Sequence, residues 1–144
     1  MAKVIVLGGG MVGAVIAETL AEQAGWEVAV ADRDPHALRA AKNRAVERSL
    51  DVRPVEADLA DQNALRMLLA PFDLVVGAAP GALGLRTLET IVESGKACVD
   101  ISFLPEDPRH LADTAEKTGA CVVYDMGVAP DRKSTRLNSS HTHL

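Results

Sequence analysis

The sequence predicts an α/β protein built on one doubly wound, parallel, six-stranded sheet with the strand order 3-2-1-4-5-6. Three observations support this fold class. Apolar, strand-like runs alternate with helical patterns throughout residues 1–130. The strand-like runs are short and mostly apolar on both faces, which is typical of a parallel sheet covered by helices. The first run leads directly into a glycine motif and a helix, the arrangement with which Rossmann-type folds begin.

Local signals place the individual helices and strands. Strands are expected at residues 3–7, 27–32, 52–57, 74–77, 97–101 and 121–124. Helices are expected at residues 11–24, 35–50, 61–70, 84–94 and 105–118. Asp34-Pro35 and Asp61 are typical helix starts, and a glycine follows three of the helices as a C-terminal cap does. These glycines are Gly25, Gly95 and Gly119.

The first strand leads into Gly8-Gly9-Gly10-Met11-Val12-Gly13. In this motif Gly8 allows a tight turn, Gly10 leaves room for a pyrophosphate, and Gly13 lets the helix pack closely on the strand. The helix begins near Met11, so the free N–H groups of its first turn and its positive dipole end face the phosphates. The motif therefore predicts a dinucleotide site. The alternative is a glycine-rich turn that binds nothing.

The second strand ends at Asp32. An acid at this position accepts hydrogen bonds from the adenosine ribose hydroxyls, and its charge repels a 2′-phosphate. Asp32 therefore favours NAD as the cofactor. Arg33 leaves NADP open, because an arginine just past the second strand can hold a 2′-phosphate. The alternative for Asp32 is a solvated strand end.

The third strand contains Pro54, which cannot donate a hydrogen bond to a neighbouring strand. Its strand should therefore lie at an edge, as the third strand does in the order 3-2-1-4-5-6. Asp58 and Leu59 follow this strand, and an acid with an apolar neighbour could border the adenine. Asp58 is equally well explained as a loop acid near the helix start at Asp61, so both interpretations stay open.

The fourth strand is followed by Gly77-Ala78-Ala79-Pro80-Gly81, a loop without large side chains. Such a loop lets the backbone approach the ribose or the nicotinamide, and Pro80-Gly81 fixes a turn. Asp100 lies near the end of the fifth strand, where it either contacts the nicotinamide end or a further domain, or caps the next helix. The sequence assigns no catalytic acid or base and predicts no metal site.

Composition excludes several classes of function. The chain has 15 Lys+Arg against 20 Asp+Glu, a net charge of −5, which argues against nucleic acid and anionic membranes as partners. No apolar run approaches the ~20 residues that span a bilayer. Residues 1–3 lead straight into a strand, so we expect no signal peptide and a cytoplasmic protein. Cys98 and Cys121 lack metal-ligand spacing and are expected to be buried, reduced thiols.

Residues 131–144 differ in character from the rest of the chain. They are polar and without hydrophobic periodicity, so we expect them to be disordered. Residues 131–141 match an in-frame translation of a common sequencing adapter, and we therefore interpret the segment as a non-native tail. The alternative is a genuine disordered tail. His141 and His143 are not interpreted as metal ligands. Residues 1–130 then form one NAD(P)-binding domain, truncated before a second domain.

Five segments together resemble the N-terminal domain of the saccharopine dehydrogenase-like family, which includes saccharopine reductases and lysine 6-dehydrogenase-like proteins. The resemblance covers residues 1–130. The glycine motif is shared by many dehydrogenases, whereas the later segments in this order are far more specific. The segments are residues 8–13, 31–34, 77–81, 99–103 and 127–130.

The resemblance implies a Rossmann domain that binds NAD(P), followed by an α/β domain for substrate binding and dimerisation. It implies hydride transfer at a C–N bond of a small amino acid of the saccharopine or lysine type, and a homodimer for the full-length protein. It also implies contacts from named residues: to the pyrophosphate from Gly8, Gly10, Met11, Val12 and Gly13, to the adenosine from Asp32 and Arg33, and to the nicotinamide side from Ala78, Ala79 and Pro80.

One departure from the family bears on activity. The family continues after a Gly-Val-Ala-Pro-like segment with glycine and a second domain, whereas this chain continues with Asp131 and the adapter-like tail. We therefore expect the cofactor-binding half of an oxidoreductase, inactive as this fragment. The alternative is a stand-alone nucleotide-sensing Rossmann module that binds NAD or ATP as an effector. The loop at residues 78–80 and the run at residues 100–103 favour the enzyme half.

Overall fold

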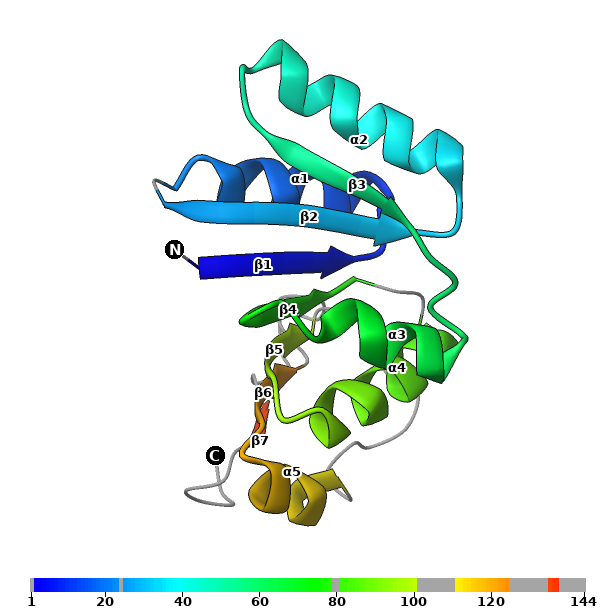
Figure 1. The fold of residues 1–144 in the computed structure, drawn as a ribbon, viewed down its shortest axis with the longest axis vertical. Coiled ribbons are helices and arrows are strands. Elements are labelled where there is room, and N and C mark those ends of the chain that lie inside the picture. The colour runs from blue at the N-terminus through cyan, green and yellow to red at the C-terminus, as the bar shows by residue number, and fades with distance from the viewer. Residues whose placement is uncertain (1, 24, 79–80, 101–110, 125–134, 138–144) are drawn as a thin grey trace.

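One sheet runs through the molecule, with helices packed on both of its faces (Figure 1). The computed structural model describes residues 2–23, 25–78, 81–100, 111–124 and 135–137. The strands are β1 (Ala2–Leu7), β2 (Trp26–Asp32), β3 (Val52–Glu56), β4 (Leu74–Gly77), β5 (Ala97–Asp100), β6 (Cys121–Tyr124) and β7 (Thr135–Leu137). The helices are α1 (Met11–Ala21), α2 (Pro35–Glu47), α3 (Gln62–Leu69), α4 (Gly81–Glu93) and α5 (Ala112–Thr118).

The predicted Rossmann-type topology is confirmed. Strands β1 to β6 are parallel and lie in the order β3-β2-β1-β4-β5-β6. The strand that contains Pro54 is at the edge, as its missing N–H donor required. Helix α2 ends three residues before its predicted end, because Ser49 adopts a left-handed backbone conformation with φ 57°. Part of the predicted helix at 105–118 lies outside the described residues, and α5 is its described part.

A short strand lies inside the segment that was expected to be disordered. β7 pairs antiparallel with β6, and Val122 faces Leu137 in the register. The structure differs here from the disorder expected for residues 131–144. The physical reason is the edge that β6 presents: its unpaired N–H and C=O groups are a template for any extended segment within reach.

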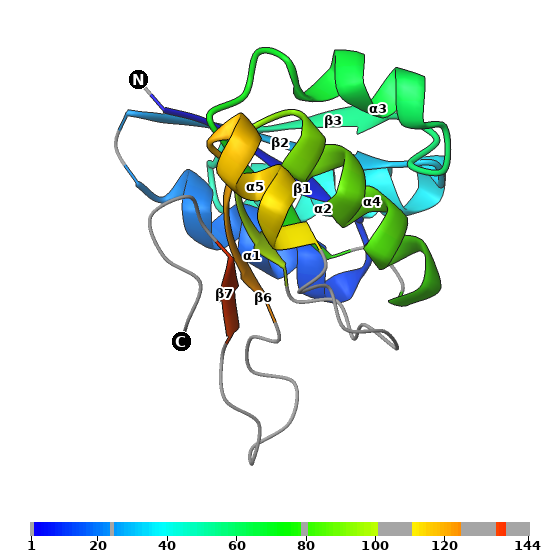
Figure 2. The ribbon, with the colours of Figure 1, turned by 90° about the horizontal axis from the view of Figure 1, so that it is seen from below.

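Both faces of the central strand β1 are buried, which explains its continuous apolar sequence. Val4 and Val6 lie in one core cluster with side chains of α1 and α2. Ile5 and Leu7 lie in a second cluster with side chains of α3, α4 and α5. Figure 2 shows these helices around the sheet. Within the described ranges, no helix combines the length and apolar character that crossing a membrane requires.

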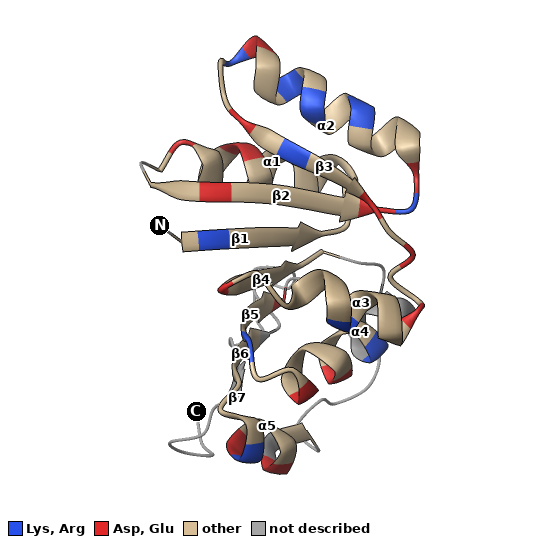
Figure 3. Cartoon of the chain, in the orientation of Figure 1, with Lys and Arg blue, Asp and Glu red and all other residues tan. Residues whose placement is uncertain are grey.

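A buried glutamate joins α1 to α2. Glu18 is 3% exposed, and its carboxylate accepts hydrogen bonds from Arg44 Nε at 2.7 Å and from Arg48 at 3.4 Å. Arg48 also pairs with Glu22. Figure 3 shows acidic positions at the C-terminal part of α1 and basic positions along α2. The hydrogen bond from Arg44 lowers the pKa of Glu18; burial opposes this, and Arg48 adds to it.

We expect Glu18→Gln to lower the free energy of unfolding at neutral pH. Because the pKa of Glu18 in the folded chain lies below its ordinary value of 4.5, its ionised form stabilises the fold above that pH. This contribution is lost as the pH falls through the lowered pKa. Urea unfolding of wild type and variant at pH 7 and below pH 4.5 measures it, with the exposed Glu47→Gln as control. A difference that persists undiminished in acid would contradict the assignment.

Candidate functional site

The turn between β1 and α1 has the geometry of an anion-binding site. Gly8 adopts φ 110°, a conformation that favours glycine, and its N–H donates to the carbonyl of Ala31 at 2.7 Å. Gly10 is the N-cap of α1, and no side chain of the described residues caps the helix there. A Cβ built on Gly10 would meet no atom of the described residues within 4 Å. Among the described residues, the start of α1 at Gly10 therefore has space beside it, and the N–H groups of a first helical turn have no intrahelical partner.

Gly13 brings α1 against this turn. A Cβ on Gly13 would lie 1.8 Å from the carbonyl oxygen of Gly8 and 3.6 Å from a methyl group of Val6. The sequence predicted a close approach between helix and strand. In the structure the tightest contact at Gly13 is with the carbonyl oxygen of Gly8, in the glycine turn itself. Only glycine allows α1 to begin so near the end of β1. The predicted roles of Gly8, Gly10 and Gly13 in backbone geometry have a direct structural counterpart.

The side chains that follow the glycines point away from the core. Met11 is 81% exposed and Val12 is 60% exposed, so their backbone N–H groups are what these residues offer to a phosphate. Arg33, at the end of β2, is also exposed. The structure therefore brings the predicted pyrophosphate residues together at one helix end, with Arg33 beyond the adjacent strand.

Asp32 lies beside the glycine turn and is half-buried. Its Oδ2 accepts a hydrogen bond from the N–H of Gly9 at 2.6 Å, and its Oδ1 accepts one from the N–H of Asp34 at 2.9 Å. The carboxylate of Asp34 in turn caps α2 by accepting from the N–H of His36. Asp32 thus connects the β1–α1 turn with the start of α2. The sequence motif did not predict the Gly9 contact.

Asp58 and Leu59 both make contacts inside the domain. The carboxylate of Asp58 accepts from the N–H of Ala60 at 3.0 Å, within its own loop before the cap of α3. Leu59 is buried in the core with side chains of α3 and α4. The contact of Asp58 is the one expected of a loop acid, and the adenine contacts of both residues stay a prediction. The apolar character of Leu59 reflects core packing, which a single sequence does not distinguish from an adenine pocket.

The loop after β4 is described only in part. The N–H of Ala78 donates to the carbonyl of Leu7 at 2.8 Å, which holds the end of β4 against the end of β1. Ala79 and Pro80 lie outside the described residues. Ala78 is therefore next to the glycine turn, as the predicted site requires.

Gly77 and Asp100 form a contact that the sequence reasoning missed. They are register partners on β4 and β5, and a Cβ on Gly77 would lie 2.8 Å from Asp100 Oδ2. Asp100 is 1% exposed. Burial, with the nearby Asp100 charge, raises the pKa of the Cys98 thiol well above its ordinary value. Cys98 is a buried free thiol, as predicted, and Cys121 is half-buried. The sequence signal that could have revealed the Gly77–Asp100 contact is the coincidence of a glycine and an acid at the ends of two adjacent strands.

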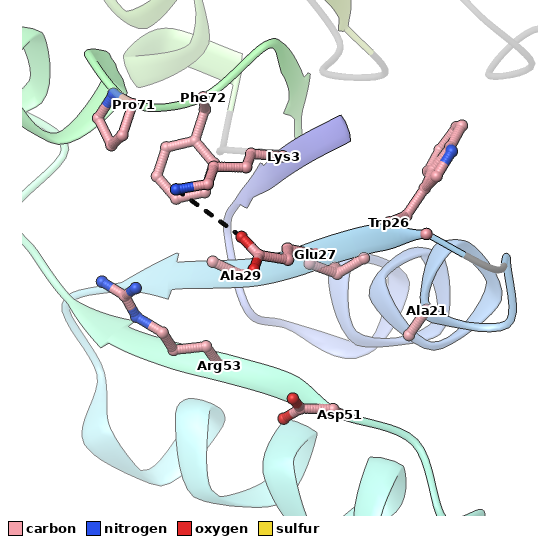
Figure 4. Close-up of a pocket in the computed structure, with 11 residues that line it drawn as sticks. Lys3, Ala21, Trp26, Glu27, Ala29, Asp51, Arg53, Pro71 and Phe72 are labelled. Carbon is pink, nitrogen blue, oxygen red and sulfur yellow. Dashed lines mark ion pairs between the residues drawn. The ribbon is translucent and has the colours of Figure 1, made fainter. Parts of the chain in front are cut away.

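A groove of 470 Å³ lies at the other end of the strands (Figure 4). Lys3 and Glu27 form an ion pair across it at 3.8 Å, with Phe72 beside Lys3 and Arg53 on the edge strand. None of the described residues that line it belongs to the predicted dinucleotide site. The charged side chain of Arg53 precedes Pro54 on β3, and such charges are typical of an edge strand that is protected from pairing with another strand.

Comparison with known proteins places this geometry in a family context. A family model described as the saccharopine dehydrogenase NADP binding domain matches residues 4–123. No curated protein sequence matches the chain. Among solved structures, apo saccharopine dehydrogenase (L-Glu forming) from Saccharomyces cerevisiae is similar at 25% identity and TM-score 0.75, over 90% of this chain. This chain spans 28% of that enzyme's length.

Two short-chain dehydrogenases share the fold alone. A metagenomic short-chain oxidoreductase in complex with NADP has 18% identity and TM-score 0.60, with 85% of this chain and 80% of that chain covered. A short-chain dehydrogenase/reductase from Serratia marcescens has 16% identity and TM-score 0.62, with 85% and 72% covered. These likenesses support the Rossmann-type architecture.

Proposed function

Because this chain belongs to the saccharopine dehydrogenase NADP-binding domain family, we propose that it binds a nicotinamide dinucleotide at the turn between β1 and α1. One observation carries the proposal: among the described residues, the N-terminus of α1 has no side-chain cap and there is space beside Gly10, where a pyrophosphate needs both N–H donors and room. The residues present therefore fit the group. Such a site needs no basic side chain, since the backbone and the helix dipole supply the positive potential.

In this proposal the phosphates lie at the glycine turn, between Gly8 and Gly13. The adenosine ribose lies toward Asp32, and the nicotinamide extends past Ala78 toward the loop with Ala79 and Pro80. The order follows from the sheet, in which β2, β1 and β4 are adjacent. In open α/β sheets ligands lie outside the carboxyl ends of such strands.

We expect NADH to bind about tenfold more tightly than NADPH. A carboxylate and a doubly charged 2′-phosphate at about 5 Å repel each other by about 1.7 kcal/mol even at the dielectric constant of water. The two backbone hydrogen bonds hold the Asp32 carboxylate in place. Fluorescence titration with NADH and NADPH measures the preference. Tighter NADPH binding that is lost in Arg33→Ala and kept in the exposed control Arg39→Ala would reverse it and assign the 2′-phosphate to Arg33.

The chain is the cofactor half of an oxidoreductase that acts on the C–N bond of an amino acid of the saccharopine or lysine type. When bound, the nicotinamide supplies the hydride, while the protein binds and orients it. The match to 28% of the yeast enzyme's length supports a substrate domain elsewhere. The homodimer expected for the full-length protein is part of the same proposal. Turnover of a lysine-like amine by this chain alone would contradict the assignment of the chain as only the cofactor-binding half of the enzyme. Resequencing the source DNA across codon 130 tests the domain boundary and the foreign origin of residues 131–144.

A further inference from the structure

We propose that Asp32 is a positioning residue that holds the glycine turn in its binding shape, independently of any contact with ribose. The inference rests on the proposed dinucleotide binding and adds a second role to the carboxylate. In consequence, removing the carboxylate weakens binding of every dinucleotide and does not by itself convert the site to NADPH.

The first support is the hydrogen bond between Asp32 and Gly9. Asp32 Oδ2 accepts the Gly9 N–H at 2.6 Å, across 23 residues of sequence. The other oxygen accepts the Asp34 N–H, so each carboxylate oxygen has a backbone donor and the side chain is fixed in orientation. Hydrogen bonds to an ionised acceptor are stronger than those between neutral groups.

The second support is packing around Gly9. This residue is buried, and a Cβ built on it would lie 3.3 Å from the Cβ of Asp32 and 3.6 Å from a methyl group of Leu38. Leu38 belongs to α2 and is 6% exposed. The turn is therefore held between the end of β2 and α2, and Asp32 supplies its polar contact.

The third support is that successive backbone N–H groups have different partners. Gly8 donates to the carbonyl of Ala31, and Gly9 donates to Asp32, so both N–H groups are directed at the end of β2. The N–H groups of Met11 and Val12, at the start of α1, have no intrahelical partner. Ligand binding therefore falls to the start of α1, and the Gly8 and Gly9 bonds set where that start lies.

A matched pair of variants separates the two roles of Asp32. Asp32→Asn removes the charge and keeps an oxygen that can accept from Gly9, losing only the bond from Asp34. Asp32→Ala removes both. The probes are NADH, NADPH and an NADH analogue whose adenosine ribose lacks both the 2′- and the 3′-hydroxyl (dideoxy-NADH), each titrated by fluorescence. Asp34→Ala is the control, because that carboxylate caps α2 and lies two residues from Asp32.

We expect Asp32→Ala to lower affinity for dideoxy-NADH about tenfold and for NADH by at least as much, with no gain for NADPH. We expect Asp32→Asn to retain dideoxy-NADH affinity and to gain affinity for NADPH. If Asp32 acts only on ribose, both variants behave alike: dideoxy-NADH binding is unchanged and NADPH binding rises in each. That result would overturn the inference.

Amide hydrogen exchange of the ligand-free chain decides the inference without any dinucleotide. In the unsubstituted chain we expect the Gly9 N–H to exchange far more slowly than the Met11 N–H. The exchange of Gly9 should become faster in Asp32→Ala and stay unchanged in Asp34→Ala. Gly9 exchange as fast as that of Met11 would overturn the inference even if Asp32→Ala failed to fold. A wild-type chain that protects Gly9 and binds no dinucleotide would refute the proposed function and keep the positioning role.

Discussion

Gly13→Ala is expected to destabilise the domain by about 3 kcal/mol or more and to abolish dinucleotide binding. The added Cβ would lie 1.8 Å from the carbonyl oxygen of Gly8 and 2.9 Å from its carbon. Both are backbone atoms at the end of β1, so relief requires α1 and the turn to move apart. In an unconstrained helix the same change stabilises by up to about 1 kcal/mol, so the sign of the effect is itself diagnostic.

Gly10→Ala is the matched control for this change. Its Cβ would meet no atom of the described part of the chain within 4 Å, so the free energy of unfolding should stay within about 0.5 kcal/mol of wild type. The new methyl group would nevertheless occupy the space that the pyrophosphate needs, and binding should be lost. Urea unfolding and NADH titration of both variants separate packing from ligand space. Normal NADH binding by Gly10→Ala would contradict the site.

Gly77→Ala is expected to lower the free energy of unfolding by about 1–3 kcal/mol. Its Cβ would lie 2.8 Å from Asp100 Oδ2 and 3.0 Å from its Cγ, and Asp100 is 1% exposed, so the carboxylate has little space to move into. Because Gly77 is near the end of β4 that carries Ala78, a displaced carboxylate should also weaken dinucleotide binding on the nicotinamide side.

A double-mutant cycle tests whether Asp100 is the cause. In the Asp100→Ala background the obstructing atoms are gone, and Gly77→Ala should cost clearly less than in wild type. Urea unfolding of the four chains measures this coupling. An equal cost in both backgrounds would place the effect of Gly77→Ala in the backbone and contradict the contact-based explanation.

The sequence predicted topology well because topology depends on patterns that are local. Pro54 identified the edge strand through one missing donor, and the alternation of apolar runs with helices predicted the parallel order. Asp32 was found at the end of β2 for the same reason: its position relative to the glycine motif is fixed by one strand–helix–strand unit.

Sequence patterns carry less information where long-range contacts decide. Leu59 packs in the core with α3 and α4, and the glycine at position 77 makes room for Asp100, more than 20 residues later. The contacts of Leu59 leave no signal in neighbouring residues, and that of Gly77 leaves only the coincidence of a glycine and an acid at two adjacent strand ends. Likewise, β7 pairs through backbone groups of β6, which are the same for every sequence and therefore cannot be recognised from composition.

The central position of β1 in the sheet has a consequence for synthesis of the chain. One neighbour of β1 is β2, close in sequence, but the other is β4, where Val4 lies opposite Leu74. During synthesis β1, α1 and β2 therefore exist well before β4. Until β4 is in place, one edge of Val4, Ile5, Val6 and Leu7 lacks its strand partner. An apolar strand edge without a partner is a template for pairing with another chain, so the late arrival of β4 leaves this segment exposed to aggregation.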